Sequence, residues 1–131
     1  MSEEPINFRD ASGNPVRVSV TNPLPVALFE AGADQTEYET VAASQTAQVM
    51  GGTGATGDYL TGVLVIPTTT SPGAVTILDG ATSIVIFNGG AVSLTELRPF
   101  YVQLGIKSVS GPWKITTGAN VAAIGIGNFA V

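Results

Sequence analysis

Short apolar segments separated by turn residues are the feature that most constrains the fold of this chain. From residue 46 onward, glycine, proline and asparagine interrupt β-branched runs about every 8 to 14 residues. This spacing is typical of antiparallel sandwiches and jelly rolls. We therefore predict an all-β fold, an antiparallel β-sandwich or jelly-roll-like domain with an extended N-terminal arm. The expected strands are residues 59–66, 74–78, 83–87, 99–104, 112–117 and 120–129.

Alternation within these segments predicts which side chains share a face of a strand. Trp113 and Ile115 alternate with Lys114, so we expect Trp113 in the core. The segment 59–66 is apolar at both its odd and its even positions, and the two sets cannot all enter one core. We therefore expect one set to line a subunit interface, with these candidates: Tyr59, Val63 and Val65.

The first part of the chain differs in composition from the rest. Residues 1–45 hold seven of the ten acidic residues and four of the eight prolines. We predict an arm or connector over residues 1–45, with a solvated acidic stretch over 30–45, and a β-sandwich domain over residues 46–131. Deletion of residues 1–45 is then expected to leave a folded domain.

An extended apolar segment is predicted within this arm, after a turn at Gly13-Asn14-Pro15. Valines alternate with polar residues over 16–20, and the prolines that follow favour extended backbone. Such a segment satisfies its backbone groups either by pairing with the sheet edge of another chain or by packing on its own domain. The candidate arm contacts are Val16, Val18, Val20, Leu24 and Val26.

Composition excludes several classes of partner. The net charge is −5, and no two of the five basic residues are adjacent, so no cluster is available for nucleic acid. No apolar run approaches the roughly 20 residues of a membrane helix. The acidic N-terminus has no apolar core typical of a secretory signal, so we expect synthesis in the cytoplasm. Only 11% of residues are charged, which suits close association with other subunits.

The chain offers little for catalysis or cofactor binding. It has no histidine and no cysteine, so a nucleophile–base pair and a zinc site both lack their usual residues. Asp58, Asp79 and Glu96 are the carboxylates of the domain, and local turns or solvent exposure account for them. The pattern Gly52-x-Gly54-x-x-Gly57 precedes a predicted strand instead of the helix that a dinucleotide site needs. We expect no enzyme activity, no metal and no cofactor.

Several runs resemble small virion proteins of tailed bacteriophages. They span roughly residues 47–131 and include Thr70-Ser71-Pro72-Gly73-Ala74-Val75, Pro99-Phe100 and Gly111-Pro112-Trp113-Lys114-Ile115. The resemblance implies a β-sandwich, often trimeric, that decorates a capsid or attaches a fibre, and it carries no catalytic residues.

The expected function is therefore that of a decoration, or cement, protein on the capsid surface of a virion. The expected partners are the major capsid protein or another virion protein, together with further copies of the chain, with a homotrimer favoured. Two alternatives stay open, a fibre or tail adaptor and a receptor- or carbohydrate-binding β-module. The last requires Trp113 or Tyr101 to be exposed.

Overall fold

The computed structural model describes residues 8–9, 12, 15–16 and 36–131. The chain divides into two units, Met1–Glu30 and Ala31–Val131. In the first unit, β1 (Phe8–Arg9) pairs antiparallel with β2 (Pro15–Val16), and Phe8 lies opposite Val16. The other predicted arm contacts, Val18, Val20, Leu24 and Val26, lie outside the described residues, so pairing of the arm with a sheet edge stays a prediction.

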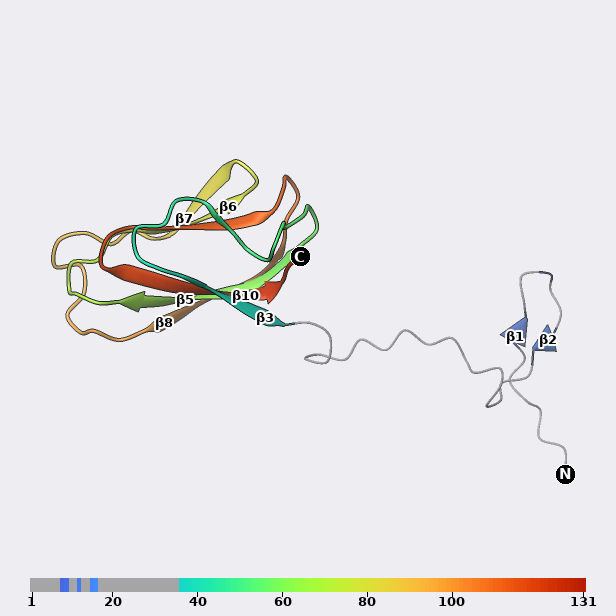
Figure 1. Ribbon diagram of the computed structural model, residues 1–131. Helices are drawn as coiled ribbons and strands as arrows, with labels where there is room; N and C mark the ends of the chain where they lie inside the picture. Colours follow the sequence, from blue (N-terminus) through green and yellow to red (C-terminus); the bar gives the residue numbers. More distant parts are fainter. Residues whose placement is uncertain (1–7, 10–11, 13–14, 17–35) are drawn as a thin grey trace, which may run out of the picture. The chain divides into compact units, whose positions relative to one another are not determined.

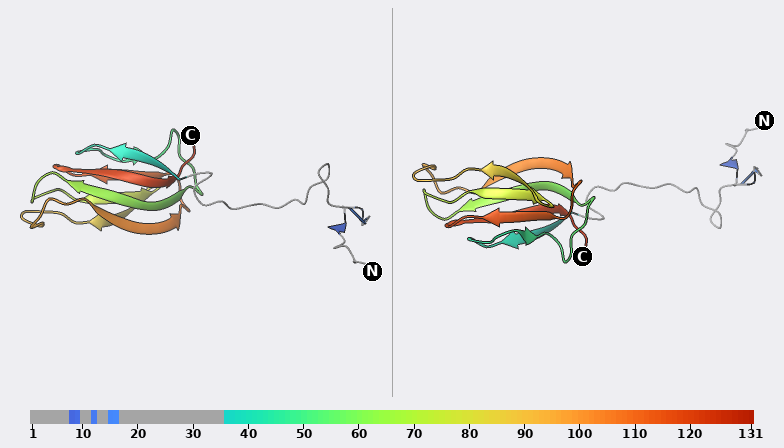
Figure 2. Two further views of the ribbon diagram at one scale, coloured as in Figure 1. Left: turned by 90° about the horizontal axis from the view of Figure 1, so that it is seen from below. Right: turned by 90° about the horizontal axis from the view of Figure 1, so that it is seen from above.

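The second unit is a sandwich of two antiparallel four-stranded sheets, which confirms the predicted fold class (Figures 1 and 2). Sheet 1 has the order β3-β10-β5-β8, and sheet 2 has the order β4-β9-β6-β7. The strands are β3 (Glu37–Val41), β4 (Gln48–Val49), β5 (Tyr59–Pro67), β6 (Val75–Asp79), β7 (Thr82–Phe87), β8 (Phe100–Lys107), β9 (Trp113–Thr117) and β10 (Val121–Asn128).

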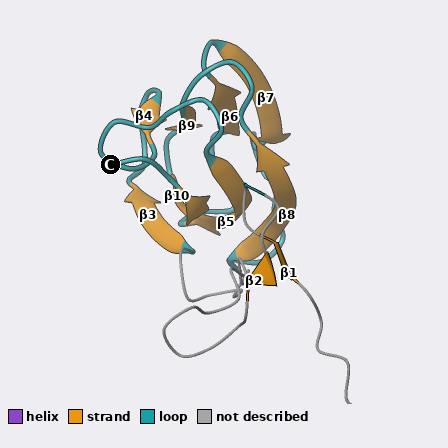
Figure 3. Cartoon of the chain, turned by 90° about the vertical axis from the view of Figure 1, so that its right-hand side faces the viewer, coloured by secondary structure: helices purple, strands orange, loops and turns teal. Residues whose placement is uncertain are grey.

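The strand order is that of a jelly roll. Along the described sandwich, every connection crosses from one sheet to the other except the β6–β7 hairpin. The hairpin turns at Gly80, whose φ of 60° favours glycine. Seen end-on, strands β3 and β4 lie at one lateral side of the sandwich, and β7 and β8 lie at the other (Figure 3).

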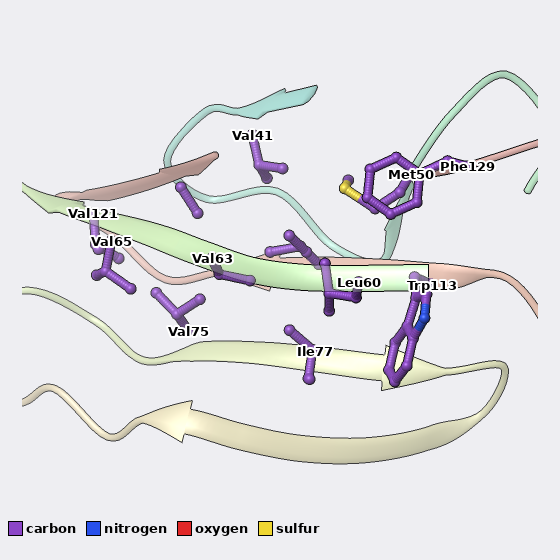
Figure 4. Close-up of a cluster of buried hydrophobic side chains, with 12 residues drawn as sticks. Val41, Met50, Leu60, Val63, Val65, Val75, Ile77, Trp113, Val121 and Phe129 are labelled. Carbon is purple, nitrogen blue, oxygen red and sulfur yellow. The ribbon is translucent and has the colours of Figure 1, made fainter. Parts of the chain in front are cut away.

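The core lies between the two sheets and contains Trp113, as the alternation of its strand predicts. Its largest fully buried side chains include Trp113, Met50, Leu60, Ile77 and Ile115, and Figure 4 shows most of them converging between the sheets. The indole Nε1 of Trp113 donates a hydrogen bond to the carbonyl oxygen of Asp58 at 2.9 Å. This bond satisfies the one polar group that the side chain brings into the core.

Glycines form part of the core face of β10, and its isoleucines face outward. A Cβ atom at Gly125 would lie 2.6 Å from Met50 Sδ and 3.0 Å from Ile115 Cδ1. A side chain here would therefore overlap residues of the opposite sheet. Ile124 and Ile126 occupy the outer face instead, where both are half-buried.

The predicted boundary after residue 45 is wrong, because the sandwich includes β3. This strand pairs with β10, with Val41 opposite Ala123, and the Val41 side chain is buried in the core. The acidic residues of β3 also have structural roles. The Glu37 carboxylate accepts a hydrogen bond from the Phe129 amide at 2.8 Å, and the Glu39 carboxylate accepts one from the Gly51 amide at 2.6 Å. The acidic composition that suggested a solvated connector thus belongs partly to an edge strand.

Candidate interaction surface

The outer face of sheet 1 carries apolar or aromatic side chains on all four strands, with the polar Thr40 and Gln103 among them. In β10 the residues that face the core are buried, and those between them point away from it. Ile124 lies opposite Leu64 of β5, and Leu64 in turn lies opposite Tyr101 of β8. On the other flank, Ile126 lies opposite Tyr38 of β3, which is 72% exposed. We call the following residues the sheet-1 face: Tyr38, Leu64, Ile66, Tyr101, Ile124 and Ile126.

Two tyrosines cover glycines on this face. A Cβ atom at Gly62 of β5 would collide with the Tyr101 ring, so that ring lies directly over the glycine. In the same way, a Cβ atom at Gly105 would lie 3.2 Å from the Tyr59 hydroxyl oxygen. An aromatic ring packed over a glycine in this way shields the backbone of the sheet from solvent, because glycine has no side chain to do so. Tyr101 stays 46% exposed and Tyr59 44% exposed, so both rings are available at the surface.

The sheet-1 face carries no charge at its centre. Glu37 and Glu39 turn their carboxylates to backbone amides, as described above, and Lys107 stands at the end of β8. The outer face of sheet 2 is more polar, since Lys114 and Thr116 of β9 point outward beside Thr76 of β6. Apolar residues of the sheet-1 face therefore adjoin one another, whereas on the outer face of sheet 2 Leu78 lies opposite Lys114 and Val85 lies opposite Thr76.

The structure places the three predicted interface residues on opposite faces of β5. Tyr59 is exposed on the outer face, but Val63 and Val65 are fully buried in the core of the same chain. The prediction is therefore wrong for Val63 and Val65, whose places on the surface are taken by Leu64 and Ile66.

A β-bulge accounts for this difference. Gly127 of β10 pairs with Leu60, whereas its neighbour Ile126 pairs with Gly62, so Thr61 is an extra residue in β5. The extra residue reverses the alternation, and Leu60 enters the core together with Val63 and Val65. The isolated Gly62 within an apolar run was the one sequence signal for such a bulge.

The carboxylates of the domain are engaged in structural bonds. Asp58 accepts a hydrogen bond from the Ala55 amide at 2.8 Å, and the Ala130 amide also approaches it, at 3.2 Å. Glu96 forms an exposed ion pair with Arg98 at 3.1 Å. Of these three carboxylates, only that of Asp79 is buried.

Asp79 binds the turn that follows β8. Its carboxylate accepts hydrogen bonds from the amides of Val109, Ser110 and Gly111 at 3.0, 2.9 and 3.2 Å. Burial by itself raises the pKa of this carboxyl group, but the three amides outweigh burial and lower the pKa below its ordinary value. A carboxylate held in this way secures a turn and is poorly suited to exchange a proton with a substrate near neutral pH.

Three of the four glycine amides in the loop before β5 already have hydrogen-bond partners in the chain. Gly51 donates to the Glu39 carboxylate, Gly54 to the carbonyl oxygen of Ala130, and Gly57 to Ser108. The loop leads into β5, as expected, and not into a helix. Among the residues that the structure describes, no group of three or more potential metal ligands comes together. The same residues include no helix long and apolar enough to cross a membrane.

No family model, no curated protein and no solved structure matches this chain. The resemblance to phage virion proteins and the partners that it implies therefore stay predictions.

Proposed function

We propose that this chain is a structural protein of a tailed-phage virion, a decoration protein that binds and stabilises the capsid. Its partner is the major capsid protein or another virion protein, and the chain works as a homo-oligomer, with three copies favoured. The observation that carries the proposal is the sheet-1 face, a group of uncharged apolar and aromatic side chains spread over a four-stranded sheet.

Physical chemistry favours such a face for binding protein. Each Å² of apolar surface removed from water contributes roughly 25 cal/mol, and no charge at the centre of the face must lose its hydration. Tyrosine adds large contact area at low entropic cost and is enriched at protein interfaces. Jelly rolls serve as capsid domains in many viruses, although a fold alone does not determine a function.

The first test is the copy number of the protein in purified virions. Quantitative mass spectrometry against the major capsid protein gives this number directly. Hundreds of copies per particle are expected for a protein that covers the capsid lattice. A few dozen copies or fewer would instead support the fibre or tail adaptor, and absence from the particle would refute a virion role.

A matched pair of variants tests the face itself. Ile124→Lys introduces a charge at the centre of the sheet-1 face, and Thr76→Lys introduces the same charge on the outer face of sheet 2. Both sites are half-buried on central strands, so their effects on folding should be comparable. Ile124→Lys is expected to abolish co-sedimentation with capsids, and Thr76→Lys to preserve it. Equal binding by the two variants would exclude the sheet-1 face as the capsid contact.

The exposed tyrosines also give some support to a carbohydrate-binding module. Trp113 is buried and supplies no platform for a sugar ring, but Tyr38 and Tyr101 are exposed on the sheet-1 face. Binding to a glycan array that Tyr101→Ala abolishes would favour this second function.

A further inference from the structure

The two lateral sides of the sandwich differ in how well they enclose the core. On the side formed by β7 and β8, which we call the open side, the core-facing residues of β8 are only half-buried. They are Phe100, Val102, Leu104 and Ile106. Between the two strands, one edge-to-face contact joins Phe87 and Phe100, with ring centroids 5.1 Å apart. Apolar side chains of the core are thus in contact with solvent along this side.

The edge strand β7 lacks the features that usually protect a sheet edge. Natural edge strands commonly carry a lysine, a proline or another charged residue that prevents pairing with a further chain. Strand β7 reads Thr-Ser-Ile-Val-Ile-Phe and has none of these. Ile84 is 40% exposed and Val85 is 55% exposed. Within the described residues, β7 pairs with β6 alone.

The backbone of β7 also presents hydrogen-bonding groups to solvent. Asp79 pairs with Thr82 across the two-residue hairpin, and Ile77 pairs with Ile84 two positions further. In an antiparallel pair, alternate residues direct their amide and carbonyl groups to the partner strand. Ser83 lies between Thr82 and Ile84, and Val85 follows Ile84. Both residues therefore direct their amide and carbonyl groups away from β6.

The open side carries little charge. From Thr82 to Lys107, the last residue of β8, the charged residues are Glu96, Arg98 and Lys107, and the first two form an ion pair with each other. The whole chain has a net charge of −5. Two copies that approach through this side therefore bring few like charges into contact.

We propose that the open side is the surface through which copies of this chain associate. A neighbouring copy would cover Ile84 and Val85, complete the burial of the core-facing residues of β8 and satisfy the outward groups of β7. A second copy is favoured, because it brings the same unpaired edge strand and the same uncovered apolar residues, and one unpaired lysine offers little to a partner selected by charge. The inference rests on the homo-oligomer of the proposed function and assigns capsid binding to the separate sheet-1 face.

The dimensions of the open side set the expected strength of association. Strands of six and eight residues are about 20 to 27 Å long, and two packed sheets are about 10 Å apart. A strip of this size is smaller than the roughly 800 Å² per partner of a standard interface. We therefore expect reversible association that depends on concentration in the micromolar range.

Sedimentation equilibrium of the full chain, from about 1 to 100 μM, tests the proposal. The wild type is expected to form oligomers over this range. Val85→Lys adds the charge that β7 lacks and is expected to weaken association at least tenfold, while thermal unfolding of dilute samples stays nearly unchanged. The control is Val109→Lys, at an exposed valine in the loop after β8. It should associate like the wild type. A wild type that remains monomeric at 100 μM, or Val85→Lys that associates like the control, would overturn the proposal.

A second experiment separates this inference from capsid binding. Ile124→Lys is expected to keep the wild-type association constant although it loses the capsid. If Ile124→Lys abolishes association, the sheet-1 face joins the copies and the open side does not. If every variant associates as expected but none of the proteins binds capsids, the proposed function fails and the open-side interface stands.

Hydrogen exchange at the Ser83 and Val85 amides should slow at least tenfold in the oligomer, and unchanged exchange would contradict pairing at β7.

Discussion

The two sides of the sandwich close the same core by different means. At the side of β3 and β4, which we call the closed side, the connection between the sheets is held by polar bonds. Thr117 Oγ1 donates to the carbonyl oxygen of Ala42 at 2.6 Å and accepts from the Gln45 amide at 3.1 Å. Gln48 Nε2 donates to the Glu39 carboxylate and to the carbonyl oxygen of Thr40, both at 3.0 Å. The open side has an aromatic contact in the corresponding place.

The difference shows that two edge strands of the same sheet can have different roles. Strands β3 and β8 are both edges of sheet 1. Val41 of β3 is nevertheless buried beside the hydrogen-bonded connection from β3 to β4, whereas Val102 of β8 is half-buried. A side closed by its own hydrogen bonds needs no partner. A side with uncovered apolar groups gains free energy when a partner covers it.

Removal of the closed-side edge strand should have the largest effect. A chain that begins at residue 46 lacks β3, and with it Val41 and the carboxylates that bind the Gly51 and Phe129 amides. We expect it to lose cooperative thermal unfolding. A chain that begins at residue 31 keeps the whole second unit and should unfold like the full protein. Cooperative unfolding of the shorter chain would show that the closed side is dispensable.

Substitution of Asp79, which binds the turn after β8, should have the second-largest effect on stability. Asp79→Asn replaces a buried carboxylate that accepts three amide bonds, and we expect a loss of about 3 kcal/mol at pH 7. Because the folded state lowers the pKa of Asp79, its contribution is complete above the unfolded-state pKa of about 4 and is lost as the pH falls through the folded-state value. The difference between the two proteins in urea unfolding should therefore shrink below about pH 4. A difference that stays constant to pH 2 would contradict this account.

Removal of the Thr117 hydroxyl, which binds the connection between β3 and β4, should have a somewhat smaller effect on stability. Thr117→Val keeps the shape of the buried side chain but leaves the Gln45 amide and the Ala42 carbonyl without this partner. The expected loss is about 2 to 3 kcal/mol, measured by chemical denaturation. Thr76→Val is the control, since the described structure gives Thr76 no side-chain hydrogen bond, and it should change stability by less than about 0.5 kcal/mol. Similar losses for both variants would indicate that the polar bonds contribute little.

The smallest expected effects come from a valine-to-alanine substitution made separately in each edge strand of sheet 1. Val41→Ala on the closed side should destabilise the dilute protein by about 2 kcal/mol, and Val102→Ala on the open side by about 1 kcal/mol, in proportion to burial. If neighbouring copies cover the open side, the cost of Val102→Ala should increase at high protein concentration, while that of Val41→Ala should not. Equal costs at every concentration would remove the distinction between the two sides.

The sequence allowed prediction of most of the strands but not of their pairing. Every segment expected to be a strand from residue 59 onward is one, with ends shifted by a few residues, because alternation and turn residues act locally. Strand β3 was missed, because its acidic residues Glu37 and Glu39 resemble a solvated connector until the amides of Gly51 and Phe129 are brought to them. The interface residues were only partly predicted for a related reason, since the Thr61 bulge depends on pairing with β10.

The amino-acid sequence by itself therefore determined the all-β class and the burial of Trp113. These features follow from side-chain periodicity, turn preferences and residue size, which each segment carries within itself. The tertiary structure alone decided that the glycines of β10 face the core, that Leu64 and Ile66 face outward, and that one side of the sandwich is closed and the other open. Those outcomes depend on which strands lie opposite one another, and the contacts that fix the pairing join residues far apart in the chain.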